Sequence, residues 1–235
     1  MAQISRKELK SDEFVSGMDA AYEYFLQHRN RILTLAVAVV VVVALGYGFF
    51  AWRASRNQKA AALLAQGLNT LHAPLLSAST PQGTAAYASV ATRAAAAAQQ
   101  FQAVVAQYPS TSAGQLARYY LGLAQLDTQS PDAQKNLAAA AASSDATVAT
   151  AAKHALANLY IQQSQPAKAH DLLLQLTQQD STTLPRAVAL LELADLDRTY
   201  NPKEAAQYYQ QLQTDYPNTA TAEQAQQQLA TLKQP

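Results

Sequence analysis

The sequence predicts an all-α protein, in which one transmembrane helix is followed by a solenoid of helix hairpins. Three observations lead to this prediction. The 235 residues include only seven Gly, and they are rich in Ala and Gln, which tolerate helix interiors. One uncharged run near the N-terminus is long enough to cross a bilayer. The remainder of the chain repeats a helical pattern at intervals close to 36 residues.

Composition excludes several classes of function. The formal net charge is +1 and only 14% of the residues are charged, so the basic surface of a nucleic-acid-binding protein is missing and no nucleic acid is expected as a partner. The absence of Cys excludes disulfides, a thiol nucleophile, Cys-ligated metals and lipoprotein attachment through Cys. The length suits one domain with an appendage or two small domains, and the repeat favours the former.

The predicted membrane anchor covers residues 32–52, ILTLAVAVVVVVALGYGFFAW, which contain no charged side chain. A helix of this length measures about 31 Å, which matches a hydrocarbon core of about 30 Å. Tyr47 and Trp52 suit the membrane interface. A buried core helix rarely runs this far without a charge, and a cleaved signal peptide has a shorter apolar region that follows a short basic start. Both alternatives therefore fit less well than a signal anchor.

Basic residues predict the orientation of the anchor. Five Lys or Arg precede it and three follow closely, namely Arg6, Lys7, Lys10, Arg29 and Arg31 against Arg53, Arg56 and Lys59. Because Lys and Arg are enriched in cytoplasmic segments, residues 1–31 are predicted to be cytoplasmic and residues 53–235 to lie outside.

The cytoplasmic segment is predicted to contain a short amphipathic helix. Apolar side chains recur in it at three- and four-residue steps, at Phe14, Met18, Tyr22 and Phe25. Ser11 or Asp12 is the expected N-cap. Such a helix lies on the membrane surface or docks against a partner helix.

The exported part contains an internal repeat. Residues 101–111, FQAVVAQYPST, are matched 108 positions later by residues 209–219, YQQLQTDYPNT. A shift of 108 is three times 36, close to the roughly 34 residues of a tetratricopeptide unit. Prolines that suit the first turn of a helix mark the intermediate copies, at Pro131, Pro166 and Pro202. Pro109 and Pro217 are predicted to end helices.

The copy around residues 155–176 resembles the tetratricopeptide pattern most closely. Its first-helix positions are occupied by Leu156, Ala157 and Tyr160, and its second-helix positions by Ala169, Leu173 and Leu176. The copy at Pro131 departs from the pattern, because a run of Ala stands where bulky residues belong. Upstream, residues 60–71 are predicted to continue the membrane helix as the first helix of the array, and residues 73–84 to form a loop or hinge.

In layout, nearly the whole chain resembles a bacterial single-pass inner-membrane family, that of the ancillary Sec-translocon subunit and its relatives. The residues that carry the resemblance, besides the repeats, are Phe25, Asn30, the segment 46–53, Lys59, Ala60, Ala61 and Leu68. The resemblance implies an inner-membrane protein with a periplasmic repeat domain, which contacts translocon subunits, periplasmic chaperones or exported chains and does no chemistry. The ending YPNTATAEQAQQQLA also resembles repeat proteins of outer-membrane assembly and cell-division coordination, which usually carry a lipid-attachment Cys that this chain lacks.

Side chains suited to chemistry are few, and no enzyme activity, cofactor or metal is predicted. None of the four histidines, at positions 28, 72, 154 and 170, has the spacing of a metal motif, although His154 and His170 lie on the two helices of one repeat, where they could pair. Nucleotide-binding and hydrolase motifs are also missing. Asp195 and Asp197 could form a carboxylate pair, but a solvated helix face explains them.

Binding of a protein in the groove of the solenoid is the predicted function. In tetratricopeptide arrays the concave surface serves for binding, and residues one turn either side of the Leu-Gly position of a first helix point into it. These residues are Tyr119, His154, Asn158, Asp195 and Arg198. A second hypothesis, an enzyme or a ligand-binding receptor, places a pocket between residues 73–84 and the solenoid.

Overall fold

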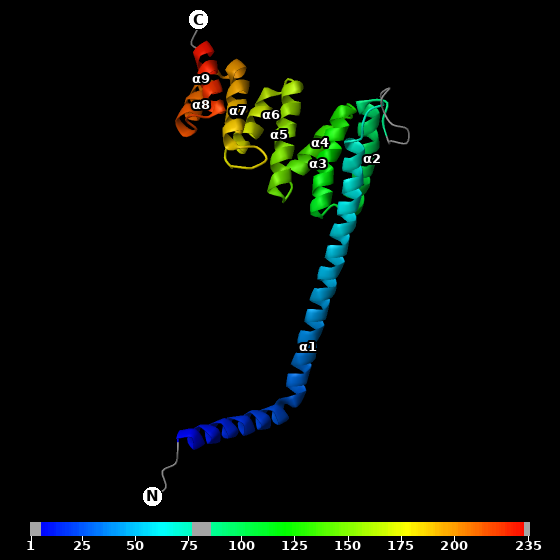
Figure 1. Ribbon diagram of the computed structural model, residues 1–235, viewed down its shortest axis with the longest axis vertical. Coiled ribbons are helices and arrows are strands. Elements are labelled where there is room, and N and C mark those ends of the chain that lie inside the picture. Colours follow the sequence, from blue (N-terminus) through cyan, green and yellow to red (C-terminus); the bar gives the residue numbers. More distant parts are fainter. Residues whose placement is uncertain (1–5, 77–85, 233–235) are drawn as a thin grey trace. The chain divides into compact units, whose positions relative to one another are not determined.

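The computed structural model describes residues 6–76 and 86–232. The helices in these ranges are α1 (Arg6–Leu71), α2 (Val90–Gln107), α3 (Ser112–Asp127), α4 (Ala133–Ala141), α5 (Ala146–Gln162), α6 (Pro166–Leu176), α7 (Arg186–Tyr200), α8 (Pro202–Asp215) and α9 (Ala220–Leu232) (Figure 1). The only β-structure in the described residues is an isolated bridge between Leu75 and Tyr87. The prediction of an all-α fold is confirmed.

The N-terminal helix α1 contains the predicted anchor. Within the described residues it is the one helix long and apolar enough to cross a membrane, and it reaches a mean hydropathy of 2.6. Many large apolar side chains of the predicted anchor, such as Leu35, Val42 and Phe50, are more than half exposed. Exposed apolar surface of this kind is typical of sites that contact a membrane or another protein.

The start of α1 differs from the prediction. The helix begins at Arg6 and runs on into the apolar stretch, so neither Ser11 nor Asp12 is its N-cap. Residues 6–10 read RKELK, and all of these residue types have high helix propensity, which accounts for the earlier start. The side chains of residues 6–25 lie outside the described part, and the amphipathic face therefore stays a prediction.

The chain divides into two compact units, residues 1–55 and residues 56–235. The second unit consists of helix hairpins: the end of α1 with α2, α3 with α4, α5 with α6, and α7 with α8, followed by α9. From α2 on, each helix packs against the next one (Figure 1). Leu64 of α1 belongs to one buried cluster with Phe101 of α2, so residues 60–71 do form the first helix of the array. The second unit is a tetratricopeptide-like α-solenoid.

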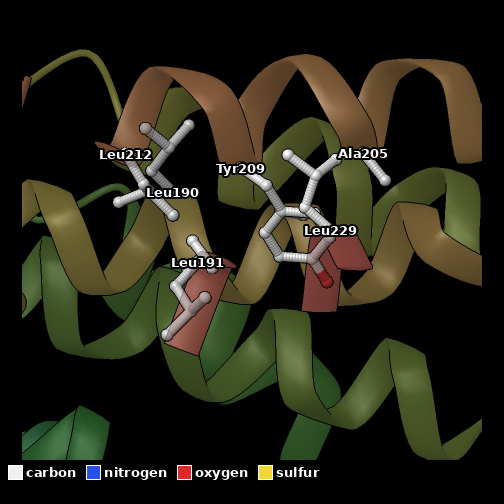
Figure 2. Packing of buried hydrophobic residues seen from close by; sticks show 8 residues of the cluster. Leu190, Leu191, Ala205, Tyr209, Leu212 and Leu229 are labelled. Carbon is white, nitrogen blue, oxygen red and sulfur yellow. The ribbon is translucent and has the colours of Figure 1, made fainter. Parts of the chain in front are cut away.

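The second helices of the four hairpins bury equivalent positions 36 residues apart. A small residue comes first in each, at Ala97, Ala133, Ala169 and Ala205. A large side chain that is fully buried follows four residues later, at Phe101, Leu137, Leu173 and Tyr209. In the last hairpin, Tyr209 packs with residues of α7 and α9 (Figure 2). The copy at Pro131 keeps a bulky residue at this position, Leu137. Three residues later Ala140 stands where the other copies bury Val104, Leu176 and Leu212, so the predicted departure from the pattern is confirmed.

Prolines mark the helix ends largely as predicted. Pro166 and Pro202 are the first residues of α6 and α8. Pro109 and Pro217 each lie two residues beyond the end of a helix. Pro131 does not begin α4 but lies in the preceding turn, because α4 starts at Ala133.

Candidate functional site

The first helices of successive hairpins are not evenly spaced. Helix α3 lies against α5, and α7 lies against α9, but no Cα atom of α5 comes within 8 Å of one in α7. The connection before α7, residues 177–185, is nine residues long, whereas the connections before α5 and α9 have four residues each. The longer connection thus coincides with the interval in which the two helices stand apart.

An open cavity of about 490 Å³ occupies this interval. It is lined by Asn158, Ile161, Pro166, Glu192, Asp195, Leu196, Thr199 and Tyr200, and we call it the α5–α7 groove. Its volume lies in the range typical of ligand-binding clefts. The lining combines two carboxylates with apolar side chains, of which Ile161 is 42% and Tyr200 54% exposed.

A polar pair connects the two helices that border the groove. Nε2 of His154 on α5 lies 2.7 Å from Oε2 of Glu192 on α7, and both side chains are about one third exposed. The hydrogen bond to Glu192 raises the pKa of His154, burial opposes this, and the carboxylate charge adds to the increase. Nδ2 of Asn158 lies 3.4 Å from the same histidine nitrogen.

The second carboxylate of the groove, that of Asp195, accepts a hydrogen bond from a residue of the second helix α8. The hydroxyl of Tyr209 on α8 donates to Oδ1 of Asp195 at 2.5 Å. Burial is the main cause that raises the pKa of Tyr209, and the hydrogen bond and charge of Asp195 raise it further. The phenol therefore stays a neutral donor at physiological pH, and it fixes the orientation of Asp195.

The structure brings three of the five predicted site residues together. Asn158 and Asp195 line the groove, and His154 contacts Glu192 of its lining. Tyr119 does not line it: this residue packs in the apolar cluster between α3 and α5, where burial raises its pKa. Arg198 also points elsewhere, since its guanidinium donates to Oε1 of Gln228 on α9.

Residue-by-residue reasoning missed most of the α7 side of the groove. Glu192, Leu196 and Thr199 lie three residues before, one after and four after Asp195. Together these four residues follow the i, i+3, i+4, i+7 pattern of a single helix face. Extending the predicted position of Asp195 along its own face would have found them.

Asp197 is not on a solvated helix face, as the sequence had indicated. Its side chain is 1% exposed, and Oδ1 lies 3.0 Å from Nδ1 of His170 on α6. It forms no pair with Asp195, because residues two apart on a helix point in different directions. His154 and His170 do not pair with each other either, since each contacts a carboxylate of α7.

The pocket of the second hypothesis lies mostly outside the described residues, since residues 77–85 are not part of them. The groove described above is located elsewhere, between α5 and α7.

Comparisons with known proteins give two similar solved structures. No protein-family profile matches the chain, and no curated protein matches it significantly. Two similar solved structures contain nearly identical TPR-like repeats of a Podosopora anserina protein described as a kinesin light chain. One matches 60% of this chain and 78% of its own at 21% identity, with a TM-score of 0.49. A single-substitution variant matches 60% and 77% at the same identity, with a TM-score of 0.48.

The assignment of a tetratricopeptide-like solenoid rests on this chain's own structure. The helices alternate as hairpins, and the buried positions of the second helices recur at a constant interval of 36 residues. A solenoid of this type is typically a scaffold for protein–protein interaction, and its concave surfaces serve for binding.

Proposed function

We propose that this chain is a membrane-anchored interaction protein, whose repeat domain binds an extended segment of a partner protein in the α5–α7 groove. The observation that carries the proposal is the composition of this groove, in which two carboxylates lie beside exposed apolar side chains. Such a surface suits a segment with at least one Lys or Arg next to an aliphatic or aromatic residue.

The carboxylates suit recognition better than catalysis. Glu192 is engaged by His154 and Asp195 by Tyr209, so both are held in place by donors of the protein itself. A preorganised carboxylate binds a basic side chain without losing its own conformational freedom on binding. We accordingly propose a function without enzyme activity, cofactor or metal chemistry at this groove.

The anchor and the distribution of basic residues support a proposal about location. We propose an inner-membrane protein with residues 1–31 in the cytoplasm and the repeat domain in the periplasm, supported by five basic residues before the span and three after it. Proteins that carry the bound segment are translocon subunits, periplasmic chaperones or exported chains, as the resemblance in layout implies. The resemblance of the C-terminal ending supports proteins of envelope assembly or cell division as alternatives.

The groove is tested by site-specific photo-crosslinking in membranes. A photoreactive phenylalanine analogue replaces Thr199 in the groove, and as a matched control it replaces Gln207, an exposed residue of the second helix α8. Crosslinks to a defined protein are expected from position 199 and not from position 207. Mass spectrometry of the product distinguishes translocon, chaperone, exported-chain and envelope partners. Equal crosslinking from both positions, or none from position 199, would contradict the proposal.

Charge in the groove is tested with the same partner. Glu192→Gln together with Asp195→Asn is expected to weaken partner binding about fivefold to twentyfold, since each exposed charge pair contributes up to about 1 kcal/mol. Higher salt is also expected to weaken partner binding by the wild-type protein, because it screens the charges.

The orientation of the chain in the membrane is tested separately, with a reporter fused after Pro235 that is active only in the cytoplasm. Activity of this reporter would overturn the proposed topology.

A further inference from the structure

Three side chains from successive helices of the last two hairpins lie close together at a place outside the α5–α7 groove. They are His170 of α6, Asp197 of α7 and Glu204 of α8, and one nitrogen or oxygen atom of each lies within 4.8 Å of the other two. Glu204 is located in the first turn of α8. The convergence results from helix packing, because the three residues lie on three different helices and follow no metal-binding motif.

Asp197 is the unusual member of this group. Its Oδ1 atom contacts Nδ1 of His170 at 3.0 Å and Nδ2 of Asn201 at 3.3 Å. Its Oδ2 atom is buried and has no hydrogen-bond partner. Within the described part of the chain, no Lys or Arg forms an ion pair with Asp197. A buried carboxylate requires a counter-charge or further donors, and His170 supplies a charge only when it is protonated.

We propose that His170, Asp197 and Glu204 form a binding site for a divalent transition-metal cation, of which Zn²⁺ is the best match. One imidazole nitrogen and two carboxylate oxygens are ligands that zinc accepts, at about 2.0–2.2 Å from the ion. In a tetrahedral arrangement, ligand atoms at these bond lengths are about 3.3–3.6 Å apart. The His170–Asp197 separation of 3.0 Å is already close to that value, and Glu204 is an exposed side chain whose ligand atom lies within 4.8 Å of the other two.

The proposed ion would supply the counter-charge that the buried carboxylate of Asp197 lacks. It provides a partner for the buried carboxylate, and its double positive charge offsets the charges of Asp197 and Glu204. The phenol of Tyr208 lies in the field of the same two carboxylates, since burial and then the charges of Glu204 and Asp197 raise its pKa. His170 is partly exposed and Glu204 is exposed, which leaves a route for the ion and a fourth coordination position for water.

A bound ion would tie three consecutive helices together. The helices α6, α7 and α8 belong to two different hairpins, so metal binding would stabilise the junction between the last two repeats. Since binding requires a neutral imidazole, it also releases any proton that His170 carries. This proposal does not depend on the proposed function, because none of the three ligands lines the α5–α7 groove.

The test measures Zn²⁺ binding to the full-length protein in detergent, without a histidine tag and after removal of metals with a chelator. Isothermal titration calorimetry is expected to give one Zn²⁺ per chain. Visible absorption of the Co²⁺ form is expected to report mixed nitrogen and oxygen coordination. His170→Gln and Glu204→Gln are each expected to weaken Zn²⁺ binding at least about tenfold. Even a substitution of a residue that only hydrogen-bonds to a metal ligand can cause a loss of this size.

Two matched variants serve as controls. His154→Gln removes another partly buried histidine that contacts a carboxylate of α7, and Glu223→Gln removes a glutamate in the first turn of α9, equivalent to that of Glu204 in α8. Both are expected to keep wild-type affinity. Glu204→Gln changes an exposed side chain and leaves the fold intact, which circular dichroism verifies. Absence of Zn²⁺ binding, or an affinity that His170→Gln and Glu204→Gln leave unchanged, would overturn the proposal.

Discussion

Helix α5 lies between α3 and α7, the first helices of the neighbouring hairpins. The interval between α3 and α5 differs from the interval between α5 and α7. Toward α3, apolar side chains close the interval, since Leu156 and Leu159 of α5 and Tyr119 of α3 belong to one cluster. Toward α7, His154 meets Glu192 across an interval that stays open as the α5–α7 groove. Toward α7, Ala157 is the buried α5 residue that shares an apolar cluster with Ala189 and Leu193 of α7, so the α5–α7 interval is closed by fewer apolar side chains of α5 and is bordered by a polar pair.

The difference separates residues that stabilise the array from residues that line the open α5–α7 groove. Apolar contacts toward α3 contribute stability in proportion to the area they bury. A polar pair that is one third exposed contributes little, because water competes for its hydrogen bonds. We infer that α5 is held in the array mainly by its contacts with α3 and with the second helices. The interval toward α7 then remains available to the proposed partner.

The sharpest test of this comparison replaces one aliphatic residue on each side of α5. Leu156 is 4% exposed and Ile161 is 42% exposed. Leu156→Ala is expected to lower the free energy of unfolding by about 3 kcal/mol, within the range of buried Leu→Ala changes. Ile161→Ala should lower it by less than about 1 kcal/mol. The measurement is urea unfolding of the full chain in detergent, followed by circular dichroism; similar losses for both variants would refute the division.

The next test concerns the close approach of α3 and α4. A Cβ atom added at Gly122 would lie 2.7 Å from Cγ of Leu137, whereas one added at Gly46 would have nothing within 4 Å. Gly122→Ala is expected to cost about 1–3 kcal/mol by overpacking. Gly46→Ala is the control and should not lower stability, since Ala has the higher helix propensity. Thermal unfolding of both variants checks this; an unchanged midpoint for Gly122→Ala would show that Leu137 moves aside without cost.

The second helices could be predicted from sequence because their pattern is local. A small residue followed four positions later by a large one, as at Ala97 and Phe101 or Ala205 and Tyr209, recurs every 36 residues wherever a hairpin must close. The apolar run of α1 was equally evident, since its length and lack of charge do not depend on neighbouring helices. The start of α1 was missed because good helix formers continue the helix past a residue that could have capped it.

The site could be predicted only in part, because its geometry depends on distances between helices. Whether Tyr119 fills an interval or lines a groove depends on how close α3 is to α5, and no local pattern in the sequence specifies that distance. The burial of Asp197 likewise arises from packing of α6 and α8 around α7. Only the nine-residue connection before α7 gave a local signal that this interval differs.

A smaller effect is expected at the base of the groove. Tyr209→Phe removes the hydroxyl that donates to Asp195 while the buried ring is retained. The free energy of unfolding is expected to fall by about 1 kcal/mol, the net contribution of a typical hydrogen bond. Urea unfolding measures this loss, and partner crosslinking at position 199 measures whether Asp195 must be held in place to bind. A loss as large as that of Leu156→Ala would mean that the groove, too, is part of the stabilising core.

The smallest effect should appear in the pH dependence of the His154–Glu192 pair. Because the pKa of His154 is raised in the folded state, the folded state binds the proton more tightly than the unfolded state. The stabilisation is therefore complete below the ordinary histidine pKa of about 6.5 and is lost as the pH rises through the raised value. For a pair one third exposed, this stabilisation should be about 0.5 kcal/mol.

Urea unfolding midpoints of wild type and His154→Gln, measured from pH 5.5 to pH 8, are expected to differ most at the acidic end and to converge toward pH 8. Glu192→Gln should remove the same pH dependence, because it deletes the cause of the shift. Parallel curves for wild type and His154→Gln across this range would mean that the pair is broken by water, and that the polar side of α5 contributes nothing to holding α7.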